Sequence, residues 1–152
     1  MKTFLIVFFS ILFLNGSLNG QTVNANYDST LAKSLNAYDY GMKSYILVLL
    51  KPGSNTSTDK ILLDSIFTGH MKNINILANN GKLVVAGPIE KNETYRGIFI
   101  LNVETVEVAQ KLLETDPAVK EKFLDPEMFV WYGSAALQEN LKLHRRIEKY
   151  SF

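Results

Sequence analysis

The sequence predicts one α+β domain, in which strand-like and helix-like segments follow one another in the order β-α-β-β-α-β. Two observations lead to this order. Short apolar runs rich in β-branched residues alternate with two longer segments whose apolar residues recur every three or four positions, and Gly, Pro and Asn mark the boundaries. The 152-residue chain is long enough for a single domain with a single core once a leader segment is set aside.

The first twenty residues have the anatomy of a secretory signal peptide. Lys2 supplies the positive end, residues 4–14 are apolar apart from one Ser, and small and polar residues run to Gly20. The apolar run is shorter than the ~20 residues that a membrane-spanning helix needs. We therefore expect cleavage after Gly20, a periplasmic or secreted protein, and no stable membrane anchor after cleavage; an uncleaved anchor is the alternative.

Composition excludes several classes of site. The chain has 16 basic and 15 acidic residues, so removal of Lys2 with the signal peptide leaves a mature chain with no net charge. A neutral chain is not typical of nucleic-acid-binding proteins. The absence of Cys excludes disulfides, a zinc–thiolate site and a thiol nucleophile. The two His residues lie far apart, and no glycine-rich phosphate loop is present. We expect no metal, no cofactor and no nucleic-acid partner.

The domain is expected between two flanking segments. Residues 21–43 form a polar leader arm with helical spacing of a few apolar residues, which leaves room for a short surface helix. The domain spans residues 44–133, and residues 134–152 form a C-terminal extension with a helix. The residues that recur at helical spacing in this extension are Leu137, Leu141, His144 and Ile147. The basic run at 144–146 is expected to be a solvated face.

The first strand is expected at residues 44–51, where the run is continuously apolar and Pro-Gly ends it. A helix follows at residues 60–79. An Asp can cap its start, and Asn-Gly ends it with the Gly in a left-handed conformation. The second strand, at residues 82–86, is broken by Gly-Pro, and the third spans residues 95–103.

Thr105 can cap a second helix whose apolar residues recur up to Leu113. The Asp-Pro pair that follows ends this helix or begins a short one over residues 117–123, and the fourth strand is expected at residues 128–132. This order is that of the ferredoxin-like split unit, in which the helices cover one face of a four-stranded antiparallel sheet. The other face would carry apolar residues, so we expect a homodimer packed sheet to sheet.

One polar residue lies in the middle of the apolar face of the 60–79 helix. On a helical wheel at about 100° per residue, His70 falls near the centre of an apolar arc of roughly 120°. The other residues of this arc are Leu63, Ile66, Phe67, Ile74, Leu77 and Ala78. Because a buried polar group is costly without a partner, we expect His70 to have one, and Asp116 is the best candidate further along the chain.

Three interpretations of His70 stay open: a general acid/base, a ligand-binding residue without chemistry, and a structural His bonded to a backbone carbonyl. Asp116 has a functional interpretation, in which its carboxylate orients His70 and stabilises the imidazolium. It also has a structural one, in which it caps a short helix that Pro117 begins. Because a carboxylate has two oxygens, Asp116 can do both.

Three further residues are expected to bind a ligand beside this pair. Gly87 and Pro88 come at the end of a strand, at the rim of the sheet, where a ligand could approach the backbone. Arg96 could contact an anionic ligand, although an Arg on an exposed strand is more often merely solvated.

Five short motifs occur in order along the domain. They are Gly-His-Met at 69–71, Gly-Lys-Leu-Val-Val-Ala-Gly-Pro at 81–88, Gly97, Glu-Val-Ala at 107–109 and Thr-Asp-Pro at 115–117. Together they resemble the YCII-related (YciI-like) domain family over roughly residues 44–132. The Trp-Tyr-Gly-Ser-Ala-Ala segment at 131–136 and the secretory start resemble exported members of that family from Bacteroidetes.

The resemblance implies a dimeric α/β-barrel fold with His70 and Asp116 at the positions of the family's His/Asp pair, which is suspected of acid/base work. One branch of the family dehydrohalogenates a chlorinated aromatic degradation intermediate. This chain departs from the family pattern by its export signal, its long tail and Val108, where an acidic residue is common. Export argues against a cytosolic catabolic role.

Three function hypotheses follow. The first is an acid/base enzyme of lyase or isomerase type that acts on a small anionic or phenolic molecule through His70 and Asp116. The second is a non-catalytic dimer that binds a small molecule in the same cleft. The third is a structural dimer in which the two residues only add stability.

Overall fold

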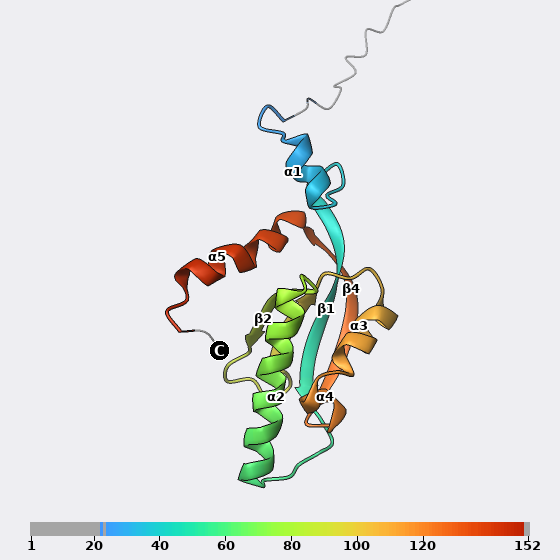
Figure 1. The fold of residues 1–152 in the computed structure, drawn as a ribbon. Coiled ribbons are helices and arrows are strands. Elements are labelled where there is room, and N and C mark those ends of the chain that lie inside the picture. The colour runs from blue at the N-terminus through green and yellow to red at the C-terminus, as the bar shows by residue number, and fades with distance from the viewer. Residues whose placement is uncertain (1–21, 23, 151–152) are drawn as a thin grey trace, which may run out of the picture.

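The computed structural model describes residues 22 and 24–150 (Figure 1). The expected signal peptide at residues 1–20 lies outside the described residues. The elements are α1 (Ser29–Ser34), β1 (Met42–Pro52), α2 (Lys60–Asn79), β2 (Leu83–Pro88), β3 (Gly97–Leu101), α3 (Val106–Leu113), α4 (Pro117–Lys120), β4 (Leu124–Ser134), the 3₁₀ helix η1 (Ala135–Glu139) and α5 (Asn140–Ile147). Within the described part of the chain, no helix has both the length and the apolarity to cross a bilayer.

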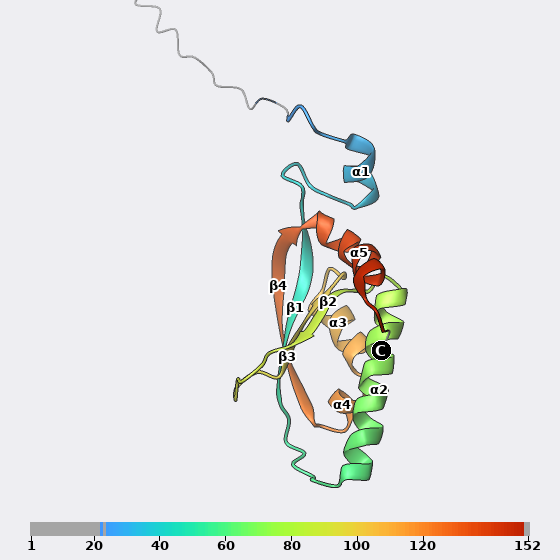
Figure 2. The same ribbon diagram turned by 90° about the vertical axis from the view of Figure 1, so that its left-hand side faces the viewer.

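Four antiparallel strands form one sheet in the order β2-β3-β1-β4. In its middle, β1 aligns Val48 with Phe99 of β3 and with Met128 of β4. The helices α2, α3, α4 and α5 lie on one side of this sheet (Figure 2), and Leu137 of η1 packs against Tyr45 and Ile100 on its other face. The expected α+β class is confirmed, and the arrangement is compatible with a ferredoxin-like fold.

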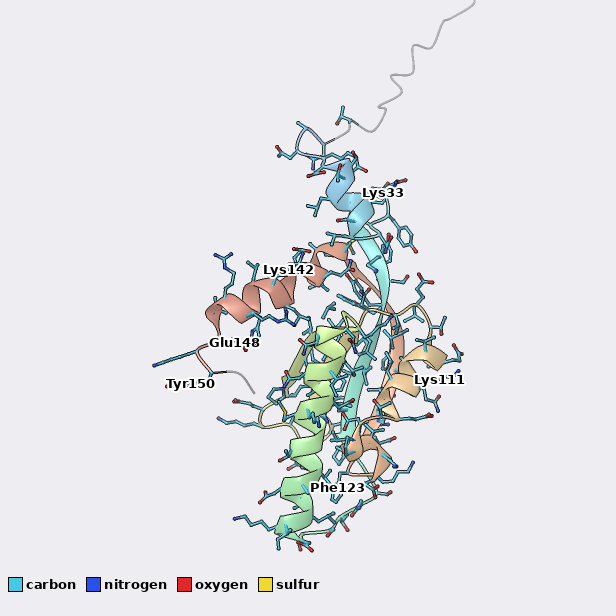
Figure 3. The ribbon with its side chains drawn as sticks, viewed as in Figure 1. Lys33, Lys111, Phe123, Lys142, Glu148 and Tyr150 are labelled. Atoms are coloured by element: carbon cyan, nitrogen blue, oxygen red, sulfur yellow. The ribbon has the colours of Figure 1, made fainter. Side chains whose placement is uncertain are left out.

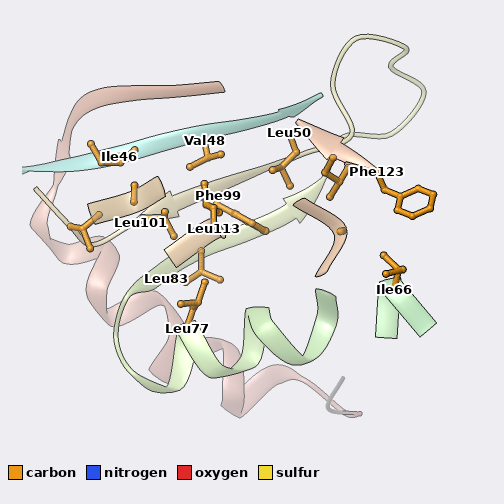
Figure 4. Packing of buried hydrophobic residues seen from close by; sticks show 14 residues of the cluster. Ile46, Val48, Leu50, Ile66, Leu77, Leu83, Phe99, Leu101, Leu113 and Phe123 are labelled. Carbon is orange, nitrogen blue, oxygen red and sulfur yellow. The ribbon is translucent and has the colours of Figure 1, made fainter. Parts of the chain in front are cut away.

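The hydrophobic core lies between the sheet and the helices (Figure 4). Alternate residues of a strand share a face, so Ile46, Val48 and Leu50 all point from β1 towards the helices. Phe99 of β3 and Leu77 of α2 pack into the same cluster. Because this layer is buried, the side chains of α2 that face it are held in place by packing on several sides.

Gly87 and Pro88 lie inside β2, and the expectation that they break the strand is wrong. The reason is that β2 is an edge strand, where a Pro without an N–H removes no ladder bond that the sheet requires. The same reason applies to Pro126 in β4, the other edge, which starts at Leu124 and is longer than expected. By contrast, β3 is shorter than expected and spans Gly97–Leu101 only.

The leader arm contains the short surface helix that its spacing allowed. Asp28 caps α1, and no residue of α1 is buried. The arm contacts the C-terminal extension, because Gln138 Nε2 donates to the Leu35 carbonyl at 2.7 Å. In addition, the ring of Tyr38 stacks on that of Tyr132 with centroids 6.0 Å apart. Lys33 and Lys142, labelled in Figure 3, mark the two terminal helices.

The C-terminal extension returns to the helix side of the sheet. After β4, η1 turns the chain and α5 crosses one end of α2 and β2 (Figures 1 and 2). Asn140 Nδ2 donates to the Val84 carbonyl at 3.1 Å, which ties the start of α5 to β2. Arg145 Nη2 donates to Asn79 Oδ1 at 2.7 Å, which ties the helix to the end of α2.

Candidate functional site

The side chains of His70 and Asp116 meet beneath α2. His70 Nδ1 lies 2.7 Å from Asp116 Oδ2, and the two residues are 46 positions apart in the sequence. Asp116 is fully buried and His70 is 9% exposed. Because an ionised carboxylate can only accept hydrogen bonds, we assign the tautomer in which the His70 Nδ1–H donates the hydrogen bond to Asp116 Oδ2. The structure thus brings together the two residues that the sequence analysis paired.

Asp116 uses its second oxygen for the helix that follows. Its Oδ1 accepts from the Ala118 N–H at 2.9 Å and caps α4, whose first residue is Pro117. Capping and contact with His70 therefore coexist on one carboxylate. The helix itself ends at Lys120, short of the expected residue 123, because Lys122 adopts φ +62° and turns the chain into β4.

Gly69 allows α2 and α4 to approach each other closely. A Cβ at this position would lie 2.8 Å from Pro117 Cγ, which is closer than side chains tolerate. Gly69 directly precedes His70, and Pro117 directly follows Asp116. The Gly69–Pro117 contact therefore lies beside the His70–Asp116 contact. We infer that the small residue sets the helix separation at which the His–Asp hydrogen bond forms.

Gly69→Ala is expected to destabilise the protein by roughly 1 kcal/mol, because the cost of overpacking exceeds the gain in helix propensity. Ala gains about 1 kcal/mol of helix propensity, whereas overpacking against a rigid proline ring costs about 1–3 kcal/mol. Urea unfolding followed by circular dichroism measures the difference. Gly87→Ala is the matched control, because a Cβ there meets nothing within 4 Å; a more stable Gly69→Ala protein would contradict the steric argument.

Two aromatic side chains hold the imidazole ring. Phe99 stacks on His70 with centroids 5.9 Å apart and planes inclined by 25°, and Phe67 meets it edge-on at 5.9 Å and 79°. With Nδ1 bonded to a fully buried carboxylate, the opposite edge of the ring, which carries Nε2, is the edge available to a ligand. His70 is therefore oriented by three neighbours.

A cavity of about 1050 Å³ opens between α2, the β2–β3 edge of the sheet and α5. Its lining includes His70, Gly87, Pro88 and Arg96, all of which were expected at the site, whereas Asp116 lies behind His70 and is not part of the lining. The walls are mostly apolar and aromatic. They include Phe67, Met71, Ile74, Leu83, Phe99 and Leu141. Such a cavity suits a molecule with an apolar body.

Arg96 lies at the end of the cavity where β3 begins. Its backbone N–H donates to the Leu50 carbonyl at 2.7 Å, and its own carbonyl accepts from Ile89 at 2.9 Å. The backbone is thus fixed while the side chain stays exposed. Arg96 can present a permanent positive charge to a ligand in the cavity.

One part of the apolar arc of α2 is buried in the core, and another part lines the cavity. The buried residues of the helix are Ile66, His70, Asn73 and Leu77. Phe67, Ile74 and Ala78, which the sequence placed on the same face, instead line the cavity. Sequence analysis missed the buried Asn73, because its amide is polar and lies on the side of the helix towards α3 and α4. Asn73 Oδ1 accepts from Thr115 Oγ1 at 3.0 Å, next to Asp116.

The C-terminal helix supplies cavity residues that the sequence analysis did not assign. Leu141, His144, Arg145 and Glu148 line the cavity. Their spacing of three, four and seven positions places them on one helix face, so the signal was present in the sequence. Residues 144–146 are all exposed, as expected of a solvated face, and His144 and Arg145 also border the cavity. Ile147, which also recurs at helical spacing in the sequence, is 80% exposed, because it lies off this line.

Among residues 22 and 24–150, no group of three or more His, Asp or Glu side chains is placed to hold a metal ion. The same residues contribute neither Ser, Thr nor Lys to the cavity lining, so this lining offers no hydroxyl or amine nucleophile. Comparison with known proteins found no matching family model, no similar curated protein and no similar solved structure. The YCII-related resemblance stays a prediction from the five motifs.

Proposed function

We propose that this chain is an acid/base enzyme of lyase or isomerase type that acts on a small anionic or phenolic molecule. One observation carries the proposal: an imidazole bonded to a buried carboxylate at 2.7 Å lies in the wall of an apolar cavity that also contains an arginine. Perturbed or paired titratable groups in a cleft are the usual marks of such a site.

The geometry defines what His70 would do. Because Nδ1 donates to Asp116, the neutral ring has its lone pair on Nε2. Nε2 accepts a proton from the substrate, and Asp116 holds the resulting imidazolium in place. The imidazolium then returns the proton to another atom of the substrate, or the substrate loses a leaving group and the proton passes to water. The first route is an isomerisation and the second is an elimination.

Arg96 would supply the positive charge that such a substrate needs. Removal of a proton leaves negative charge on the substrate, and a guanidinium beside a cavity with apolar walls stabilises that charge. The backbone at Gly87 and Pro88 would contact the same end of the molecule, because it lines the cavity opposite Gly97. These contacts explain why an anionic or phenolic compound is the expected substrate class.

Solvent deuterium exchange tests the proposal whether the reaction is an isomerisation or an elimination, because both begin with removal of a proton. The protein is incubated in D₂O with a panel of aromatic, enolic and phenolic acids, and loss of C–H signals is followed by ¹H NMR. The wild-type protein is expected to exchange or convert at least one compound. His70→Ala is expected to reduce that rate by about 10²–10⁴, the usual contribution of a general acid/base.

His144→Ala is the matched control, because His144 is the other imidazole in the cavity lining and is half-exposed. This variant is expected to retain more than about a tenth of the wild-type rate. A His70→Ala protein that remains folded and exchanges at the wild-type rate would remove His70 from the mechanism. Circular dichroism establishes that each variant is folded.

A non-catalytic binding module is the second candidate. The lack of a hydroxyl, thiol or amine nucleophile among the described residues of the cavity lining favours it, as does a volume at the upper end of the range for small-molecule sites. Saturation-transfer NMR on the same panel separates the two candidates. A compound that binds without exchange or conversion favours the binding module, and a panel that neither binds nor reacts favours a purely structural role.

We further propose that the protein is a homodimer joined through the sheet face opposite α2. Alternation along the strands puts several partly exposed apolar residues on that face. They are Leu47, Leu49, Val85, Ile98, Phe129 and Trp131. Two copies of one apolar face are self-complementary about a twofold axis. This arrangement is the dimeric α/β barrel that the YCII-related resemblance implies, and we propose family membership on the same motifs.

Phe129→Asp is expected to convert the dimer to a monomer, because it places a charge on the apolar face of the proposed interface. Val130→Asp is the matched control, since Val130 is the next residue of β4, is 65% exposed and points to the opposite face. Sedimentation velocity at micromolar concentration measures both. A wild-type protein that sediments as a monomer would contradict the proposed dimer.

We also infer export, with the mature protein in the periplasm or the medium. The inference depends on the signal-like composition of residues 1–20. Mass spectrometry of the exported protein should give a mature chain that begins at Gln21.

A further inference from the structure

We propose that α5 forms an anion-binding subsite at one end of the cavity, with Arg145 as its anchor. The ligand is then an elongated molecule with an apolar body and one acidic group, which binds Arg145 while the other end of the molecule lies at His70. The identity of the reacting end depends on the proposed function above. The subsite itself depends only on the cavity and on the contacts of α5.

Arg145 is positioned by α2. Its Nη2 donates to Asn79 Oδ1 at 2.7 Å, and both residues line the cavity. Among the described residues this is the one hydrogen bond of the guanidinium, which leaves its other N–H groups for an acceptor in the cavity. A guanidinium stays charged and binds a carboxylate or sulfonate through parallel hydrogen bonds.

The distance between the two ends of the cavity sets the length of the ligand. Asn79 follows His70 by nine residues on one straight helix, which corresponds to about 14 Å along the helix axis. The wall between them is apolar, with Ile74 and Ala78 on α2 and Leu141 on α5. A small phenol at His70 does not reach Arg145, whereas an elongated amphipathic acid does.

The charge of the cavity lining favours one acidic group. Arg96 and Arg145 are positive, and Glu148 is the one acidic residue that the described chain contributes to the lining. Glu148 Oε2 lies 3.7 Å from His144 Nε2, so this carboxylate has a partner of its own on α5. Arg96 precedes the start of β3, and Phe99 in the middle of β3 stacks on His70. The strand then continues towards the end of α2, where Arg145 binds Asn79. The two arginines therefore lie on either side of His70 along the cavity. Arg145 can therefore bind the acid while Arg96 serves the reacting end.

Two fluorescent dyes that differ in a single group test the subsite. The anionic probe is 8-anilinonaphthalene-1-sulfonate, and its neutral analogue is N-phenyl-1-naphthylamine, which has the same apolar body without the sulfonate. Both are titrated into the full chain, and Kd values are taken from the fluorescence increase. Arg145→Ala is expected to weaken binding of the sulfonate about tenfold or more and to leave the neutral dye within about twofold.

Arg146→Ala is the matched control, because Arg146 is the neighbouring exposed arginine of α5 and does not line the cavity. It is expected to bind both dyes like the wild type, and Arg145→Lys is expected to retain part of the sulfonate affinity. Equal sulfonate affinities for Arg145→Ala and Arg146→Ala would overturn the proposal, as would an equal loss for both dyes.

The dye measurement is independent of catalysis. His70→Ala is expected to leave the tenfold difference between Arg145→Ala and Arg146→Ala unchanged, because His70 lies at the other end of the cavity. If deuterium exchange fails and the dye difference is found, the subsite stands and the catalytic role of His70 falls. If exchange is found and the dye difference is not, the acid/base proposal stands and the elongated ligand is excluded.

Discussion

Replacing Asp116 with Ala is expected to lower the free energy of unfolding by about 3 kcal/mol, the larger part of it from the loss of the partner of His70. The substitution removes both acceptors of the buried carboxylate at once. His70 Nδ1 loses its bond to Oδ2, and the Ala118 N–H loses its bond to Oδ1. Loss of the cap alone costs about 1 kcal/mol, and a buried donor without an acceptor costs about 1–3 kcal/mol. Urea unfolding followed by circular dichroism measures the change.

Asp125→Ala makes the same chemical change in a different environment. The Asp125 carboxylate is exposed and lies 3.5 Å from Lys51 Nζ, so its loss is expected to cost less than about 1 kcal/mol. Similar losses for Asp116→Ala and Asp125→Ala would show that burial and the double contact of Asp116 contribute little. That result would contradict the expectation that the buried His70–Asp116 pair stabilises the fold.

Replacing Asp116 with Asn is expected to reduce the rate of proton exchange by about 10²–10⁴ while most of the stability remains. Asn is a good N-cap, so its oxygen keeps the bond to Ala118 and its amide group then faces His70. Because an amide NH₂ donates, His70 Nδ1 must accept, and the proton moves to Nε2. The lone pair that would take a proton from the substrate is then turned away from it.

Nitrogen NMR measures this tautomer directly. Long-range ¹H–¹⁵N spectra are expected to show a protonated Nδ1 in the wild-type protein and a protonated Nε2 in Asp116→Asn. The exchange assay gives the rate for any compound on which the wild type acts. A variant with the altered tautomer and an unchanged rate would mean that Nε2 of His70 does not take part in proton transfer.

Local chemistry made much of this molecule predictable from the sequence. The first strand is a continuous apolar run, and the helix after it begins at an Asp cap and ends before Gly81, which adopts φ +66° as expected. His70 was recognisable because a polar residue on an apolar helix face is rare. Asp116 was recognisable because Asp before Pro has a defined capping geometry.

Other features depend on neighbours that lie far away in the sequence. Whether Gly87 and Pro88 end a strand or continue it depends on the strand being at the edge of the sheet, which only pairing decides. The face that α5 turns to the cavity is likewise set by its bonds to Asn79 and Val84. The helical spacing of Leu141, His144 and Arg145 is present in the sequence, but charged residues on a helix face are ordinarily solvated, so the spacing did not indicate a cavity.

The sequence by itself determined the order of the elements, the inward-facing imidazole and the carboxylate that caps a short helix. Those features follow from periodicity and from contacts within a few residues, which the chain encodes locally. The tertiary structure alone decided that Gly69 brings the two segments close enough for a 2.7 Å bond, and that α5 closes one end of a cavity beside it. Such contacts join residues tens of positions apart, and their geometry is fixed only when the core packs.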